Sequence, residues 1–312
     1  MEHSPDNKRA FYSALTLAGS PISQVLANLS LLVLAASLSP EAYMSWGWRV
    51  TFGIAVILVG VGIYVRLKIE ETPIFVEQVE MAESNSGVRA RGPVYILRNY
   101  GLTILRLGFI HAPISLTFYI VAVFGISYLN KTGNFPTSAT LSIFLIANAV
   151  SFVGILVGGR FADRYGRRQT YAVGAAICLV AAIIFFPLAD TQNYALALFA
   201  TSLACFGVQF GNAAQGALFG EAFPTQIRFM GSAMTLSFTN LVFGSFIPFF
   251  SAWLIGLAGG NTLSVVIFWI MICILSIVLA MRSKDGKTLE GTEQTFSGRR
   301  LQQIKTPDVA SV

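Results

Sequence analysis

The sequence predicts an all-α membrane protein with eight transmembrane helices. The chain is 54% hydrophobic and has a mean hydropathy of +0.67. Only 12% of its residues are charged, whereas soluble globular proteins carry about 25%. Eight segments are apolar over about the 20 residues that a helix needs to cross a bilayer.

These segments are apolar on all sides rather than along one stripe, as helices in lipid or in a bundle require. Backbone groups in lipid must be paired within the segment, which favours helices over open strands. The alternating pattern of a barrel strand is absent. The expected spans are 16–38, 50–67, 102–128, 138–161, 169–188, 194–218, 231–256 and 262–281.

The distribution of basic residues predicts the orientation of the spans. If the segment 160–168 is cytoplasmic, alternation places 18 of the 21 Lys and Arg residues on that side. Arg49 and Lys131 fall on the opposite side, and Arg106 falls within a span. Lys and Arg accumulate in cytoplasmic loops, so we expect a cell-membrane protein with both termini in the cytoplasm. The excess of basic residues is then a topology signal and does not indicate nucleic-acid binding.

Two polar segments divide the chain. Residues 68–100 separate two spans from six, and we expect them to form a cytoplasmic linker. Residues 283–312 contain few apolar residues and are expected to be a disordered cytoplasmic tail.

The sequence offers no set of residues for enzymatic, metal or cofactor chemistry. Cys178, Cys205 and Cys273 all lie in apolar stretches without the spacing of metal ligands. HExxH, GxSxG and phosphate-loop glycine motifs are absent from the sequence. We therefore expect neither an enzyme nor a bound cofactor or metal.

The stretch GGRFADRYGRRQT, from Gly158 to Thr170, concentrates four arginines and one aspartate between two spans. Gly166 permits a left-handed turn, and small residues before it allow close helix packing. Asp163 suits the positive end of a helix dipole. The arginines can pair with carboxylates, for which Glu70, Glu71 and Glu221 are candidates. Two interpretations stay open: a latch that closes and opens, or topological anchoring by positive charge.

Several motifs resemble the major facilitator superfamily. The loop matches its pattern G-x-x-x-D-R-x-G-R-R at Gly159, Asp163, Arg164, Gly166, Arg167 and Arg168. EAFPTQIRFMG, with Glu221 and Arg228, is similar to the loop after the tenth span. The stretches EHSPDNKRAFYSAL, WGWRVTF and ETPIF are similar to segments around the fifth and sixth spans of the metabolite:proton symporter branch. Members of that branch carry shikimate, dicarboxylates, proline or betaine.

The resemblance implies spans five to twelve of a twelve-span transporter. Residues 1–67 then correspond to the last two spans of the N-terminal half, and residues 101–282 to a complete six-span C-terminal half. In such a fold a small-molecule site lies near the midplane between the halves, and alternating access moves one half on the other. The implied partners are a small polar metabolite, protons and the bilayer. The alternative is a truncated chain that does not transport alone or needs a second chain.

Candidate pathway residues lie in the span 102–128. His111, Ser115 and Tyr119 are spaced i, i+4, i+8 and are expected on one helix face. His111 suits proton coupling, and the alternative is a hydrogen-bonded histidine between packed helices. Arg106 is either a clamp for an anionic solute or a side chain that reaches to the interface.

Amide side chains form a second group of candidates. Gln209, Asn212 and Gln215 are expected to face the cavity or to bond neighbouring helices. Weaker candidates, for which packing is the favoured interpretation, are Gln24, Asn28, Asn148 and Asn240.

Overall fold

The computed structural model describes residues 9–68, 92–224 and 227–282, and this part of the chain contains helices and no strand. Its first region begins with α1 and α2, which run on from one another as a single rod. A short turn of helix then leads into a second long helix. The elements of this region are α1 (Arg9–Leu17), α2 (Gly19–Ser37), α3 (Pro40–Ser45), η2 (Gly47–Arg49) and α4 (Val50–Lys68).

The second region contains six spans. Three are interrupted: two by π-helical turns and one by a non-helical pair of alanines. The elements are α6 (Pro93–Phe118), η3 (Tyr119–Phe124), α7 (Gly125–Lys131), α8 (Thr137–Tyr165), α9 (Arg167–Asp190), α10 (Tyr194–Asn212), α11 (Gln215–Ala222), α12 (Arg228–Asn240), η5 (Leu241–Ser245), α13 (Ile247–Leu257) and α14 (Leu263–Arg282).

The predicted all-α fold with eight membrane spans is confirmed, because eight helices in the described residues are long and apolar enough to cross a bilayer. Most helix ends lie within four residues of the prediction, and two boundaries differ by more. Helix α6 begins at Pro93, inside the expected linker 68–100, because Pro at the first helical position costs no hydrogen bond. Helix α1 begins at Arg9, before the apolar segment itself. The expected tail 283–312 lies outside the described residues.

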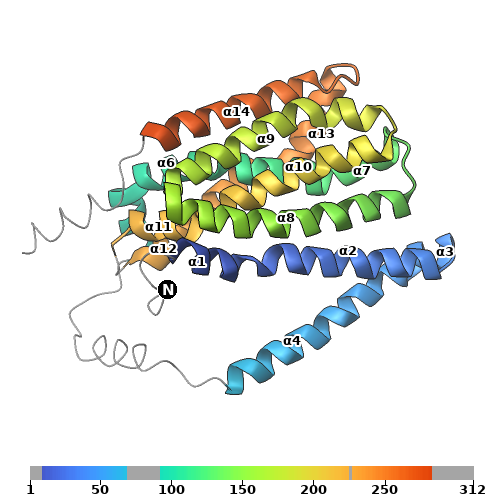
Figure 1. Cartoon of the computed structure of the whole chain (residues 1–312), viewed down its shortest axis with the longest axis horizontal. Helices are drawn as coiled ribbons and strands as arrows, with labels where there is room; N and C mark the ends of the chain where they lie inside the picture. Colours follow the sequence, from blue (N-terminus) through green and yellow to red (C-terminus); the bar gives the residue numbers. More distant parts are fainter. Residues whose placement is uncertain (1–8, 69–91, 225–226, 283–312) are drawn as a thin grey trace, which may run out of the picture.

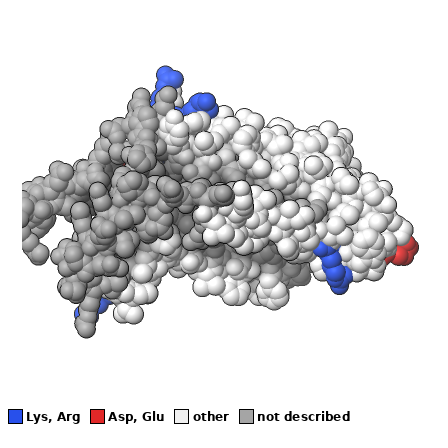
Figure 2. Space-filling model, turned by 90° about the horizontal axis from the view of Figure 1, so that it is seen from below, with Lys and Arg blue, Asp and Glu red and all other residues white. Residues whose placement is uncertain are grey.

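The six later spans pack around a buried core. Trp269 of α14, Tyr171 and Phe185 of α9 and Phe144 of α8 are among the largest side chains that are almost completely buried there. The rod of α1 and α2 lies along α8 (Figure 1). Helix α4 turns back at α3 and diverges from this bundle (Figure 1). Figure 2 shows one face of the molecule, and the described surface between its few blue and red side chains is uncharged.

Candidate functional site

The arginine-rich loop is a tight turn between α8 and α9. Gly166 has φ +101° and separates the two helices. A side chain is strained in that conformation, which explains a glycine here. The predicted left-handed turn is confirmed, and it places the residues on either side of Gly166 at one end of the bundle.

Asp163 binds the first turn of α1. The backbone N–H of Ala10 donates to Oδ1 at 2.9 Å, and that of Phe11 donates to Oδ2 at 3.0 Å. The first N–H groups of a helix have no partner within the helix, and the helix dipole favours a carboxylate there. The expectation that Asp163 sits against a helix N-terminus is confirmed, although 152 residues separate it from Phe11.

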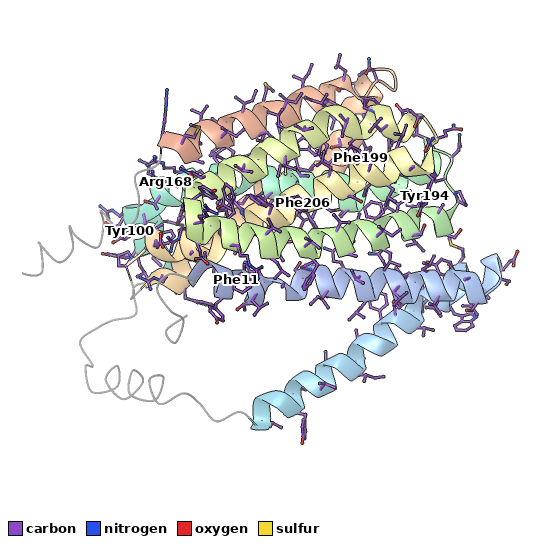
Figure 3. All side chains as sticks on the ribbon, viewed as in Figure 1. Phe11, Tyr100, Arg168, Tyr194, Phe199 and Phe206 are labelled. Carbon is purple, nitrogen blue, oxygen red and sulfur yellow. The ribbon has the colours of Figure 1, made fainter. Side chains whose placement is uncertain are left out.

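Arginines of the same loop make further contacts across the helix ends. Of the three candidate carboxylates the structure describes Glu221, and Arg167 Nη2 lies 3.0 Å from its Oε1 in α11. Glu70 and Glu71 lie outside the described residues. The guanidinium of Arg160 lies 4.5 Å from the ring centre of Phe11, within cation–π range. Figure 3 shows Phe11 and Arg168 at this end of the bundle, opposite Tyr194. We call Asp163, Arg160 and Arg167 with their partners the latch.

Other members of the motif contribute differently. Arg164 is exposed, and its guanidinium lies 5.3 Å from the ring centre of the adjacent Tyr165. Arg228 begins α12, and its buried Nε has no hydrogen-bond partner among the described residues. At Gly159 a Cβ would come 2.9 Å from the Cβ of Ala14, so the close approach of α8 to α1 requires glycine there.

Halfway along the bundle, α2, α6, α8 and α10 enclose a small cavity. Its wall carries side-chain amides from three helices, two hydroxyls, one thiol and one aromatic ring. Its volume is about 10 Å³, room for about one water and far below the ~300 Å³ of a typical ligand site. The polar and aromatic side chains that line it are Gln24, Asn148, Gln209, Thr117, Ser151, Cys205 and Phe118. We call it the amide cavity.

The predicted face of α6 does not line the amide cavity. His111 is buried, and its Nδ1 lies 3.1 Å from Tyr171 Oη, between α6 and α9. Phe219 of α11 also contacts the imidazole ring. This surrounding favours the interpretation of a hydrogen-bonded histidine between packed helices. A part for His111 in proton coupling stays a prediction.

Ser115 and Tyr119 turn toward another neighbour, α12 and its π-helical turn. The Ser115 hydroxyl donates to Asn240 Oδ1 at 2.9 Å. The Tyr119 ring packs against Gly244, where a Cβ would lie 2.7 Å from Cε2. The three side chains therefore do not converge on one site: His111 meets α9 and α11, whereas Ser115 and Tyr119 meet the α12 span.

Arg106 lies away from the amide cavity. Its side chain is exposed, and Nη2 donates to the backbone carbonyl of Arg282 at 2.9 Å. This carbonyl belongs to the last turn of α14, where helix carbonyls lack partners and attract cations. The geometry favours the interface interpretation over the anion clamp.

The three amides expected on one helix are divided by a break. Helix α10 ends at Asn212, and Gln215 begins α11 after two alanines. Only Gln209 of the three lines the cavity. Its Oε1 accepts from Asn212 Nδ2 at 3.3 Å. Asn212 therefore hydrogen-bonds Gln209 without lining the cavity itself.

Sequence reasoning underrated two cavity residues and missed others. Gln24 and Asn148 line the cavity, although packing was the favoured interpretation for both. Thr117, Phe118, Ser151 and Cys205 were missed because none is unusual in an apolar span. Polar residues in the middle of several spans were the available signal, but the sequence does not show which of them converge. No group of three potential metal ligands occurs in the part of the chain that the structure describes.

Comparison with known proteins places these features in a family. The model of the Major Facilitator Superfamily matches residues 1–247 and 149–306. The chain is 30% identical to the Inner membrane metabolite transport protein YhjE of Escherichia coli (strain K12), over 81% of this chain and 58% of that protein. It is 29% identical to the Shikimate transporter of the same strain, over 92% of this chain and 65% of that protein. The Proline/betaine transporter of that strain is 27% identical, over 95% and 60%. The chain thus spans about three fifths of the length of these relatives, which are named as transporters and not as enzymes.

Proposed function

Since the chain belongs to the major facilitator superfamily, we propose that it takes part in secondary active transport of a small polar metabolite by alternating access. One observation carries this proposal. A single helix, α8, is held at its end by the latch and lines the amide cavity at its middle. A movement that separates α1 from the end of α8 is therefore coupled mechanically to the width of the cavity.

The latch is suited to open and close because the contacts of Asp163 and Arg160 join two groups of helices. Asp163 belongs to α8, and its two donors belong to α1. Release of α1 breaks both hydrogen bonds together and leaves their N–H groups to water. In the arrangement described the latch is made and the cavity has room for about one water. We assign this arrangement to a state closed at the arginine-loop end.

We propose the domain division and orientation that the sequence predicts, with the boundary of the linker moved. Residues 1–67 correspond to part of one transporter half and move against residues 101–282, to which the first turns of α6 from Pro93 are added. The arginine-rich loop and both termini lie in the cytoplasm, because basic residues accumulate there. The protein then resides in the cell membrane.

We propose a carboxylate or betaine-like solute and proton coupling. The relatives named for shikimate and for proline and betaine support this solute class. The cavity wall supports it as well, since Gln24, Asn148 and Gln209 orient polar groups without the cost of a buried charge.

Uptake by the purified chain in proteoliposomes tests the proposal. Labelled shikimate, proline and glycine betaine are offered in turn, with an inward proton gradient, an inward sodium gradient or none. We expect one solute to accumulate with the proton gradient and to leak out when a protonophore is added. Accumulation with sodium alone contradicts proton coupling. Absence of accumulation under all conditions contradicts transport by this chain alone and favours the alternative that it needs a second chain.

A further inference from the structure

Thr117 differs from every other buried threonine in the described helices. Four of the others donate their hydroxyl hydrogen to the backbone carbonyl one turn earlier, and the fifth donates to a side-chain amide. For Thr117 the structure records no such bond to the carbonyl of Pro113. The five donors are Thr170, Thr201, Thr235 and Thr239, which bond the backbone, and Thr140, which bonds Asn130.

Thr117 differs from the other threonines because its hydroxyl oxygen is bound by a residue of α14. Trp269 Nε1 donates to Thr117 Oγ1 at 2.8 Å, and both residues are fully buried. An indole nitrogen donates and cannot accept, so Thr117 is the acceptor of this bond and its own hydrogen stays available. The thiol of Cys178 also lies within hydrogen-bonding reach of Thr117, but sulfur is a weak acceptor. The hydroxyl is therefore held in place by a tryptophan while its hydrogen lacks a strong acceptor.

Thr117 lines the amide cavity. The neighbouring wall offers a second donor, since Gln209 uses its Oε1 to accept from Asn212 and keeps its NH₂ group for another partner. Asn148, in contrast, uses its Nδ2 on the carbonyl of Phe144 and keeps an acceptor oxygen. Among the residues that line the cavity, those of α6 and α10 thus carry hydrogen-bond donors and one of α8 carries an acceptor.

We propose that Thr117 contacts the solute and donates its hydroxyl hydrogen to a carboxylate oxygen of it, and that Trp269 is the positioning residue that holds this hydroxyl. The inference rests on the proposed transport function, and it names the side chain that recognises the acidic end of the solute. Hydrogen bonds to an ionised oxygen are shorter and stronger than those between neutral groups. A carboxylate is therefore a better acceptor for this hydrogen than the sulfur of Cys178.

The first test compares Thr117→Val with Thr117→Ser and Thr201→Val. Valine keeps the shape and loses the hydroxyl, serine keeps the hydroxyl, and Thr201 is an equally buried threonine that does not line the cavity. The readout is the KM for whichever of shikimate, proline or glycine betaine the wild type takes up. We expect about a 10-fold rise in KM for Thr117→Val, the size of one hydrogen bond to a charged group. KM should stay near the wild-type value for Thr117→Ser and Thr201→Val.

The second test separates positioning from simple packing. Trp269→Phe frees the Thr117 hydroxyl to turn to the carbonyl of Pro113, so KM should rise although Trp269 is not among the cavity residues. The double variant Thr117→Val/Trp269→Phe should then have the KM of Thr117→Val alone. It also leaves no indole N–H unpaired, so it can be measured even if Thr117→Val does not fold. If the effects of the two changes on KM simply add, the positioning role of Trp269 is overturned.

The outcomes separate the two proposals. If the wild type takes up a solute and Thr117→Val keeps its KM, the inference is overturned and the transport function stands. If Thr117→Val does not fold and the double variant has the wild-type KM, the inference is overturned as well. A wild type that takes up none of the three solutes overturns the transport function and this inference with it.

Discussion

Helix α8 meets the first two helices in two regions of opposite chemistry. At its end the contact is charged, because Asp163 holds two N–H groups of α1 and Arg160 lies over Phe11. At its middle the contact is neutral, because Asn148 and Ser151 share the amide cavity with Gln24 of α2.

This difference in chemistry indicates how readily each region can exchange its hydrogen-bond partners. The carboxylate of Asp163 is matched to two N–H groups that have no other partner, so the latch is either made or broken. The amides of the cavity can replace one hydrogen-bond partner by another at little cost, so a solute can compete there. We infer that the charged region sets the conformation and the neutral region accepts the solute.

The largest expected effect comes from the contact of α8, the helix that carries both regions, with α10. Gly158 of α8 faces the backbone carbonyl of Phe210 in α10, and a Cβ would collide with it. Gly158→Ala should therefore force α8 and α10 apart and cost about 1–3 kcal/mol of stability. Thermal unfolding of the purified protein in detergent measures this loss.

Gly101→Ala is the matched control on α6, because a Cβ at this position would have no neighbouring atom within 4 Å. Alanine favours a helix over glycine, so the midpoint of unfolding should stay or rise. Equal midpoints for the two variants would show that α8 and α10 do not form a rigid wall.

The next largest effect is expected from a substitution that disrupts the charged region alone. Asp163→Asn removes the negative charge and leaves one acceptor oxygen for two N–H donors of α1. The latch should weaken by about 1–3 kcal/mol, and initial uptake rates at matched membrane abundance should fall at least several-fold. Arg168→Lys keeps its positive charge and should impair uptake less. Equal activity of the two variants would contradict the latch and leave topological anchoring as the role of the loop.

The sequence was sufficient to predict part of the contacts of the arginine-rich loop, because their chemistry is local and directional. The charged loop lies between two apolar spans, and its glycines and aspartate each have few possible roles there. Asp163 at a helix N-terminus followed from these roles. Glu221 was one of three candidate carboxylates, and the sequence did not show that Arg167 is the arginine that pairs with it. The sequence also predicted eight spans, since the length and apolarity of a span are properties of the segment itself.

The sequence was not sufficient to predict the amide cavity, because a cavity depends on how helices rotate against one another. Helical spacing places His111 and Ser115 along one side of α6, but it does not show that the first meets Tyr171 of α9 and the second Asn240 of α12. The break after Asn212 likewise separated Gln215 from Gln209. Thr117 became a candidate only through its contact with Trp269, 152 residues away.

A smaller effect tests the neutral region. The side chain of Gln24 lines the cavity, whereas Asn28, one turn later, donates to the backbone carbonyl of Gln24. Gln24→Ala should raise KM for the transported solute about 5-fold, the size of one neutral hydrogen bond. Asn28→Ala should leave KM near the wild-type value. A larger effect of Asn28→Ala on KM would move the solute away from the amide cavity.

The smallest effect on uptake is expected at His111, outside both regions. His111 and Tyr171 bond each other between α6 and α9, and aromatic side chains surround the imidazole. His111→Phe fits this surrounding but leaves the Tyr171 hydroxyl without its partner, which should cost about 1–3 kcal/mol of stability. Adding Tyr171→Phe removes the unpaired hydroxyl, so the double variant should be more stable than the sum of the single losses implies. Because neither ring lines the cavity, the pH profile of uptake should not move in any of these variants. A profile that shifts in His111→Phe but not in Tyr171→Phe would assign His111 to proton coupling and extend the functional region from the cavity to the α6–α9 contact.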